Sequence, residues 1–205
     1  MNKFCALAFL VVGSLQPAGA TLLRTFDNPG DGIYLGTTSL LPLVGSEFTS
    51  VTSVTDGIET ISFSDALTVL SVPTTWGTWN TPPFSESGTP GVLATVFVSS
   101  ITLSLSSPQT IFGLEVEPDF GTNLITLDFF NGATNIGSIS RTVSSFGGAL
   151  LLAGQLDQSV TSAVVSSNSD FAIAQLRYGT EVPEPYSAAL LLSGLAAFGF
   201  RRRGR

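Results

Sequence analysis

Apolar and polar residues alternate along much of this chain. Ile101, Leu103 and Leu105 are separated by Thr102 and Ser104, and a period of two is the signature of a half-buried β-strand. Similar runs predict further strands at 58–63, 66–72, 92–98, 111–117, 124–130, 135–140, 160–166 and 171–178.

Turn-forming residues separate these runs. They are Thr55-Asp56-Gly57, Ser106-Ser107-Pro108, Asn131-Gly132, Phe146-Gly147-Gly148 and Ser167-Asn168-Ser169-Asp170. Asn-Gly between two apolar runs is typical of a tight hairpin. No stretch between the chain ends has a sustained helical period with capping residues. The pattern predicts an all-β domain, an antiparallel β-sandwich that is jelly-roll-like.

The alternation fails at both ends of the chain. Residues 1–3 are a short basic segment, residues 4–15 are apolar, and Ala18-Gly19-Ala20 follows Pro17. This order predicts an N-terminal signal peptide. Ala18 and Ala20 form the A-x-A pattern of its cleavage site, and cleavage after Ala20 would leave Thr21 as the first residue. Cys5 lies before the apolar segment, so we expect no lipid attachment there.

At the other end, residues 186–200 carry no charge. As a helix they would reach only ~22 Å, against ~30 Å for a hydrocarbon core. Residues 182–185 and snorkelling arginines bring the segment close to a span, so we expect a marginal transmembrane helix. The alternative, an amphipathic helix packed on the domain, lacks a polar face. The basic cluster that would stay cytoplasmic is Arg201, Arg202, Arg203 and Arg205.

The C-terminal segment resembles a known sorting signal. Pro183-Glu184-Pro185, the apolar stretch and the arginine cluster stand in the order of the PEP-CTERM signal, which exosortases of Gram-negative bacteria process. The resemblance implies a temporary inner-membrane anchor, cut near the triplet. It also implies a protein of the cell surface or extracellular matrix, associated with exopolysaccharide and biofilm. The apolar stretch is short for the family and contains Ser187 and Ser193. The general sequence pattern of residues 111–178, without any specific motif, also resembles the β-rich body of such proteins, but more loosely.

These segments define three parts: a signal peptide at 1–20, an exported β-sandwich domain at 21–181 and the sorting signal at 182–205. The exported domain has fourteen acidic and three basic residues, a net charge near −11. Such a domain repels nucleic acid, so we expect none as a partner. It contains no cysteine and therefore forms no internal disulfide.

Missing residue types restrict the chemistry of the domain. The chain has no histidine, which excludes a Ser-His-Asp triad and a His-ligated zinc site. Residues 21–181 also lack lysine and cysteine, which excludes Schiff-base and thiolate mechanisms. Carboxylate chemistry and the binding of hard cations through oxygen remain.

Glu115, Glu117 and Asp119 are the main carboxylate group. Residues two apart share one face of a strand, so Glu115 and Glu117 are expected to project together. They form either an acid/base pair or cation site, or a solvated strand edge that discourages aggregation. The sequence favours the strand edge.

Asp27, Asn28 and Asp31 are weak candidates for calcium. Their oxygens and the neighbouring glycines suit a calcium loop, although the spacing does not match an EF-hand. An ordinary Asx-Pro-Gly turn explains the same residues. No cofactor is therefore expected, with calcium as the alternative.

Trp76, Trp79 and Asn80 form the third group, followed by Pro82-Pro83. Two exposed indoles could stack on sugar rings, with Asn80 donating hydrogen bonds. The alternative is that both rings fill the open end of the sandwich, since large aromatic side chains are mostly buried.

Three functions fit the sequence. The preferred one is a non-catalytic surface or matrix protein, with an exosortase-type enzyme, the inner membrane and exopolysaccharide as partners. The second is a carbohydrate-binding module that uses Trp76 and Trp79. The third is a carboxylate-based glycosidase, which needs two carboxyl groups facing each other ~5–10 Å apart.

Overall fold

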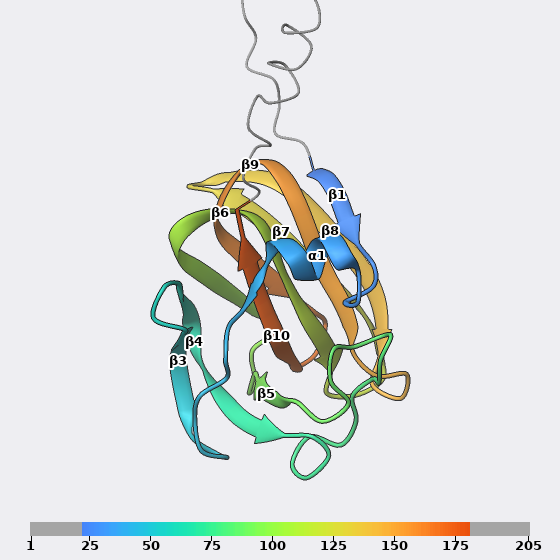
Figure 1. Cartoon of the computed structure of the whole chain (residues 1–205). Coiled ribbons are helices and arrows are strands. Elements are labelled where there is room, and N and C mark those ends of the chain that lie inside the picture. Colours follow the sequence, from blue (N-terminus) through green and yellow to red (C-terminus); the bar gives the residue numbers. More distant parts are fainter. Residues whose placement is uncertain (1–21, 181–205) are drawn as a thin grey trace, which may run out of the picture.

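Two long strands, β6 (Ser100–Pro118) and β9 (Leu150–Ser166), organise the domain in a computed structural model that describes residues 22–180 (Figure 1). All strand pairs of the sheet are antiparallel. The other elements are β1 (Leu22–Phe26), α1 (Gly32–Thr37), β2 (Ser39–Leu40), β3 (Ser50–Thr55), β4 (Thr60–Ser71), β5 (Gly91–Ala94), β7 (Thr122–Asn131), β8 (Thr134–Ser144) and β10 (Phe171–Gly179).

β6 and β9 pair along their whole length and change their outer neighbours halfway. The first half of β6 pairs with β4, and its second half pairs with β10. Correspondingly, the second half of β9 pairs with β7 and its first half with β1. The register of the β6–β9 ribbon shifts between Ser104 and Gln109. The ribbon therefore doubles back there, and its two halves enclose one core that contains Leu103, Leu114 and Leu127.

Glu59 stabilises the point at which the ribbon turns. Its fully buried carboxylate accepts hydrogen bonds from Ser106 N (2.6 Å), Ser106 Oγ (2.8 Å), Ser107 N (3.2 Å), Ser107 Oγ and Gln109 Nε2 (2.9 Å). Burial raises the pKa of Glu59, but these bonds outweigh burial and the pKa is lowered overall. The predicted turn at Ser106-Ser107-Pro108 is thus a bend at which β6 continues as one strand, and not a turn between two strands.

The second half of β6 is buried on both faces. Phe112, Leu114 and Val116 point into the main core, whereas Ile111 packs with Tyr34 of α1 on the outer face. A helix and a long loop cover this outer face, so residues 111–118 are all buried. Strict alternation of buried and exposed residues is therefore confined to the first half of the strand.

A bulge in β10 changes which of its side chains face the core. Phe171 and Ile173 point inward, and the register shifts between Ala174 and Arg177, where Gln175 adopts a left-handed conformation (φ 50°). Leu176 and Tyr178 then point inward. Arg177 consequently lies on the covered outer face, opposite Gly113.

The chain enters and leaves the domain at the end where the ribbon turns. β1 begins opposite Leu156, and β10 ends opposite Ile111. The other end, called the loop end below, carries the connections 95–99, 119–121, 145–149 and 167–170, which hydrogen bonds join. The described part of the chain therefore ends, after β10, at the end of the domain that is opposite the loop end (Figure 1).

The prediction of an all-β antiparallel domain is confirmed, whereas the jelly-roll-like order of strands stays a prediction. The runs at 58–63 and 66–72 belong to one strand, β4. β1, β2, β3 and the short helix α1 were not predicted. The signal peptide at 1–20 and the signal at 182–205, with its helix, lie outside the described residues. Within residues 22–180 no helix has the length and hydropathy needed to cross a membrane.

The contact between α1 and β6 gives a testable prediction. A Cβ at Gly113 would lie 2.2 Å from Ala153 Cβ and 2.6 Å from Tyr34 Oη. Gly113→Ala should lower the free energy of unfolding by about 2–3 kcal/mol in urea titrations. Gly36→Ala is the control, because its Cβ meets nothing within 4 Å. Equal stability of the two variants would contradict this packing.

Candidate functional site

The segment 73–90 between β4 and β5, called the Trp loop below, lies on the outer face of the sheet. Trp76 and Trp79 pack there against small side chains that include Ala172 and Ala174 of β10. Because alanines leave space above the sheet, both indoles sink in and each is only 8% exposed. Of the two alternatives, this burial contradicts the exposed sugar platform and agrees with buried rings, although the rings lie on the outer face of the sheet and not in the open end of the sandwich. Asn80 donates from Nδ2 to Ala149 O (3.3 Å), which fixes the loop.

Each indole caps one carboxyl group of β6. Trp76 Nε1 donates to Glu117 Oε2 and Trp79 Nε1 donates to Glu115 Oε2, both at 2.9 Å. Glu115 and Glu117 share one face of the strand, as predicted from their spacing. They do not form a solvated strand edge, because β6 lies between β9 and β10 and both side chains are fully buried.

The surroundings of Glu117 are those of a protonated carboxyl group. Thr78 Oγ1 lies 2.6 Å from Glu117 Oε1 and 2.6 Å from Ser145 O. A hydroxyl has a single hydrogen to donate. Both contacts are hydrogen bonds only when Glu117 donates to Thr78 and Thr78 donates to Ser145. Burial also raises the pKa of Glu117, in agreement with this arrangement.

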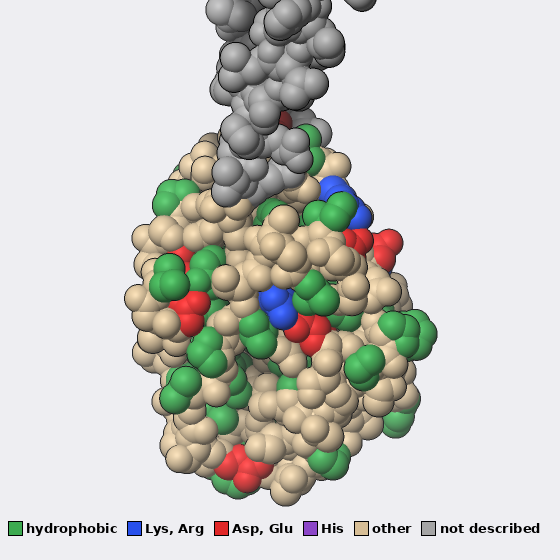
Figure 2. Space-filling view, viewed as in Figure 1, with side chains coloured by type: hydrophobic (Ala, Val, Ile, Leu, Met, Phe, Trp, Pro, Cys, Tyr) green, Lys and Arg blue, Asp and Glu red, His purple; other side chains and the backbone are tan. Residues whose placement is uncertain are grey.

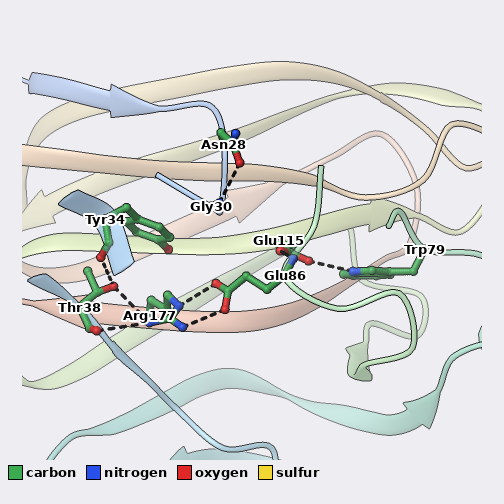
Figure 3. A network of polar contacts seen from close by, with 8 residues as sticks. All are labelled: Asn28, Gly30, Tyr34, Thr38, Trp79, Glu86, Glu115 and Arg177. Atoms are coloured by element: carbon green, nitrogen blue, oxygen red, sulfur yellow. Dashed lines mark hydrogen bonds and ion pairs between the residues drawn. The ribbon is translucent and has the colours of Figure 1, made fainter. Parts of the chain in front are cut away.

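Glu115 is more deeply enclosed than Glu117. Its Oε1 accepts a hydrogen bond from Glu86 N (2.6 Å), and its Oε2 accepts the bond from Trp79 (Figure 3). Burial raises the pKa of Glu115 to about 7, although these two donors act in the opposite direction. Glu115 is thus a carboxyl group that titrates near neutral pH.

A buried ion pair lies beside Glu115. Arg177 Nε donates to Glu86 Oε1 (2.6 Å) and Nη2 donates to Oε2 (2.9 Å), while Nη1 donates to Thr38 O (3.2 Å) (Figure 3). Tyr34 is fully buried close by, and its hydroxyl has no hydrogen-bond partner. Burial raises the pKa of Tyr34 well above its ordinary value. The ion pair borders a hollow of about 380 Å³ lined by Pro29, Gly30, Leu35, Pro82, Pro83, Ser85, Glu86 and Arg177.

The calcium candidates have separate roles. Asp31 caps α1 by accepting from Ile33 N (2.8 Å) and Tyr34 N (3.2 Å), and it pairs with Arg24 at 2.7 Å. Asn28 accepts from Gly30 N, as in an ordinary Asx turn,. Asp27 pairs with Arg141. Within residues 22–180, no three acidic side chains lie close enough together to hold a metal ion.

A second hollow, of about 230 Å³, opens at the loop end and is called the loop-end hollow below. Two exposed phenylalanines border it, Phe120 (67% exposed) and Phe146 (90%). Its lining residues are Thr75, Trp76, Gly77, Thr78, Pro118, Asp119, Phe120, Ser145 and Phe146. The sequence analysis did not assign a role to either phenylalanine. The available signal was a phenylalanine directly before glycine, as in Phe120-Gly121 and in the predicted turn at Phe146-Gly147.

The buried carboxyl groups predict a pH dependence of stability. The folded protein holds the Glu115 proton more tightly than the unfolded chain, because burial raises this pKa from 4.5 to about 7. The resulting stabilisation is complete below pH ~4.5 and is lost as the pH rises through ~7. The free energy of unfolding should therefore fall by up to about 3 kcal/mol between these pH values, and Glu117 contributes with the same sign.

Denaturant titrations from pH 5 to pH 8 measure this fall. Glu115→Gln cannot titrate and should flatten the profile, even though it also loses stability at every pH. Asp65→Asn, which changes an exposed carboxyl group, is the matched control and should keep the parent slope. A parent protein that becomes more stable over this range would contradict the assignment.

Comparison with solved structures returns matches at low similarity. A peptidoglycan O-acetylesterase matches at 12% identity and TM-score 0.37, over 70% of this chain and 34% of its own. The match to CsCBM6-3 from Clostridium stercorarium, in complex with cellobiose, has 11% identity and TM-score 0.35 and covers 68% and 100% of the two chains. CBM29_1, a family 29 carbohydrate-binding module from Piromyces equi, matches at 14% identity and TM-score 0.35, over 75% and 97%.

The matched part thus spans about a third of the esterase chain. No curated protein matches this sequence. A family model does match: residues 181–205 fit the PEP-CTERM protein-sorting motif. The chain therefore carries the PEP-CTERM signal, which marks an exported, extracellular protein that an exosortase-type enzyme processes at the membrane.

Proposed function

We propose that the mature protein is a non-catalytic component of the cell surface or extracellular matrix that associates with exopolysaccharide in biofilm. The sorting motif at residues 181–205 carries this proposal, because it directs the chain out of the cell. The domain then meets polysaccharide as the main polymer of its surroundings. The earlier alternative, a binding module that uses Trp76 and Trp79, is not retained because both rings are buried.

The direction in which the domain is displayed supports this proposal. The sorting segment follows β10, which has nine residues and so is ~30 Å long at ~3.3 Å per residue. The loop end lies at the far end of this strand. While the tail anchors the chain, the exposed phenylalanines of the loop end would project away from the membrane. On the face seen in Figure 2, apolar side chains lie scattered rather than gathered in one patch.

A carboxylate glycosidase is the weaker candidate. The raised pKa of Glu115 would suit a general acid,. However, Glu115 and Glu117 are both capped by indoles and inaccessible to solvent. The loop-end hollow is lined by a single carboxyl group, that of Asp119. The proposal therefore assigns the buried carboxyl groups a role in holding the Trp loop.

Removal of the tail is the first prediction for this function. In a host that contains exosortase, the surface-released protein should lack Arg201, Arg202, Arg203 and Arg205, and intact-mass analysis measures this directly. Replacing Pro183-Glu184-Pro185 by Ala-Ala-Ala should leave the tail in place. A released protein that keeps the arginine cluster as its main form would refute the processing step.

Retention by exopolysaccharide is the second prediction. Cells that make exopolysaccharide should hold the processed protein at their surface, whereas an otherwise equal strain that makes none should release it to the medium. Quantitative immunoblotting of the cell and medium fractions gives the ratio. The same ratio in both strains, with normal tail removal, would refute the association while leaving the sorting intact.

A further inference from the structure

We propose that the loop-end hollow binds a polysaccharide that carries free amino groups, through the rings of Phe120 and Phe146 and the carboxylate of Asp119. This inference rests on the proposed function and assigns it a site and a class of sugar. It uses the loop-end hollow instead of the buried indoles.

The two phenylalanines belong to turns that are fixed to each other. Ser145 N donates to Gly121 O (2.9 Å), which joins the turn that carries Phe146 to the turn that carries Phe120. Gly121 (φ 72°) and Gly148 (φ 83°) adopt left-handed conformations that these turns require,. The two turns therefore hold the rings of Phe120 and Phe146 in fixed positions relative to each other, while both rings remain largely exposed. Such pre-organisation lowers the entropic cost of binding.

The floor of the hollow is a continuation of the buried network. Trp76 and Thr78 line it. Beneath the surface, Trp76 donates to Glu117 and Thr78 accepts from Glu117. A Cβ at Gly77 would meet nothing within 4 Å, so this part of the wall is open. A sugar ring has apolar faces and hydroxyl edges, and it fits a site with aromatic borders and a polar floor.

The charge at the hollow favours an amino sugar. The Asp119 carboxylate has no hydrogen bond or ion pair with another described residue. A second carboxylate, that of Glu47, accepts from Thr75 Oγ1 (2.8 Å), and Thr75 also lines the hollow. The three arginines of residues 22–180 are all paired elsewhere, with Asp31, Asp27 and Glu86. The hollow is therefore negative and has no arginine in its lining.

An ammonium group matches both features of the site. It is attracted to a carboxylate and to the face of an aromatic ring. A uronic acid polymer would instead be repelled at low salt. A neutral polysaccharide would use only the rings and would gain nothing from Asp119. Sugars that carry free amino groups are the class that uses every exposed feature of the hollow.

Calorimetric titration of the processed, surface-released protein tests this inference. The probes are glucosamine oligomers, the same oligomers fully N-acetylated, and oligomers of a uronic acid. The free amines should bind more tightly than the acetylated form, and the uronic acids should not bind. Asp119→Asn should weaken binding of the amine about two- to fivefold without changing the acetylated oligomer. Phe146→Ala should weaken both about three- to tenfold.

Two variants serve as matched controls, and thermal unfolding confirms that each protein is folded. Asp65→Asn removes the same charge on β4, and Phe84→Ala removes an exposed ring of the Trp loop; neither residue lines the hollow. Neither should change the binding. If Asp119→Asn and Asp65→Asn weaken the amine equally, the preference is one of net charge and the site is refuted.

The result also separates this inference from the proposed function. Tight binding of acetylated or acidic oligomers with no preference for amines would refute the class of sugar. Normal retention by exopolysaccharide in Phe146→Ala and Asp119→Asn cells would refute the hollow and leave the proposed function standing. Loss of retention in those two variants, but not in the controls, would support both.

Discussion

The doubling back of the β6–β9 ribbon is the constraint on which the rest of the domain depends. Where the register of the paired strands shifts, backbone groups lose their partners on the neighbouring strand and need other hydrogen bonds. Pro108 has no N–H and so supplies no donor there. Glu59 provides the acceptors, with hydrogen bonds from Ser106, Ser107 and Gln109. A buried carboxylate is costly unless it is fully hydrogen-bonded. Because Glu59 would be costly to bury without these hydrogen bonds, its position is tied to the point at which the ribbon turns.

A second requirement follows from this turn. Folding the ribbon over buries one face of each half. The outer face formed by the second half of β6 and the adjacent β10 still carries Glu115, Glu117 and Arg177. The Trp loop and α1 cover these groups and supply a partner for each: two indoles, a backbone amide and the Glu86 carboxylate. The polar network and the two hollows beside it are consequences of covering a sheet face that is not wholly apolar.

Strand positions were readable from the sequence for most strands with one solvated face, although β1 and β3 were missed. β7 and β8 follow the predicted alternation, and the Asn131-Gly132 turn joins them with Gly132 at φ 58°. Even the bulge of β10 leaves a trace, because its inward residues change from Phe171 and Ile173 to Leu176 and Tyr178. The length of β6 was missed because Ser and Pro at a bend look the same as Ser and Pro at a turn. The length of β4 was missed because the polar pair Ser64-Asp65 separates its two apolar runs.

The site was less predictable because its contacts join distant parts of the chain. The spacing of Glu115 and Glu117 correctly predicted a shared face, but nothing local indicates that Trp79 would cap Glu115. The sequence presents the acidic strand, the tryptophans and the Asx-Gly loop as three separate groups. In the structure, parts of all three lie close together. Ala172 and Ala174, which make room for the indoles, were the only local sign that a loop lies over β10.

The long pairing of β6 with β9 also has a kinetic consequence. Ser100 pairs with Ser166, and Val116 pairs with Leu150, so the central ribbon joins segments that are far apart in sequence. Chains dominated by such contacts fold slowly, because closing large loops costs entropy before any contact repays it. The ribbon cannot be completed until the chain is available as far as residue 166. Folding is thereby deferred until most of residues 22–180 can take part in it.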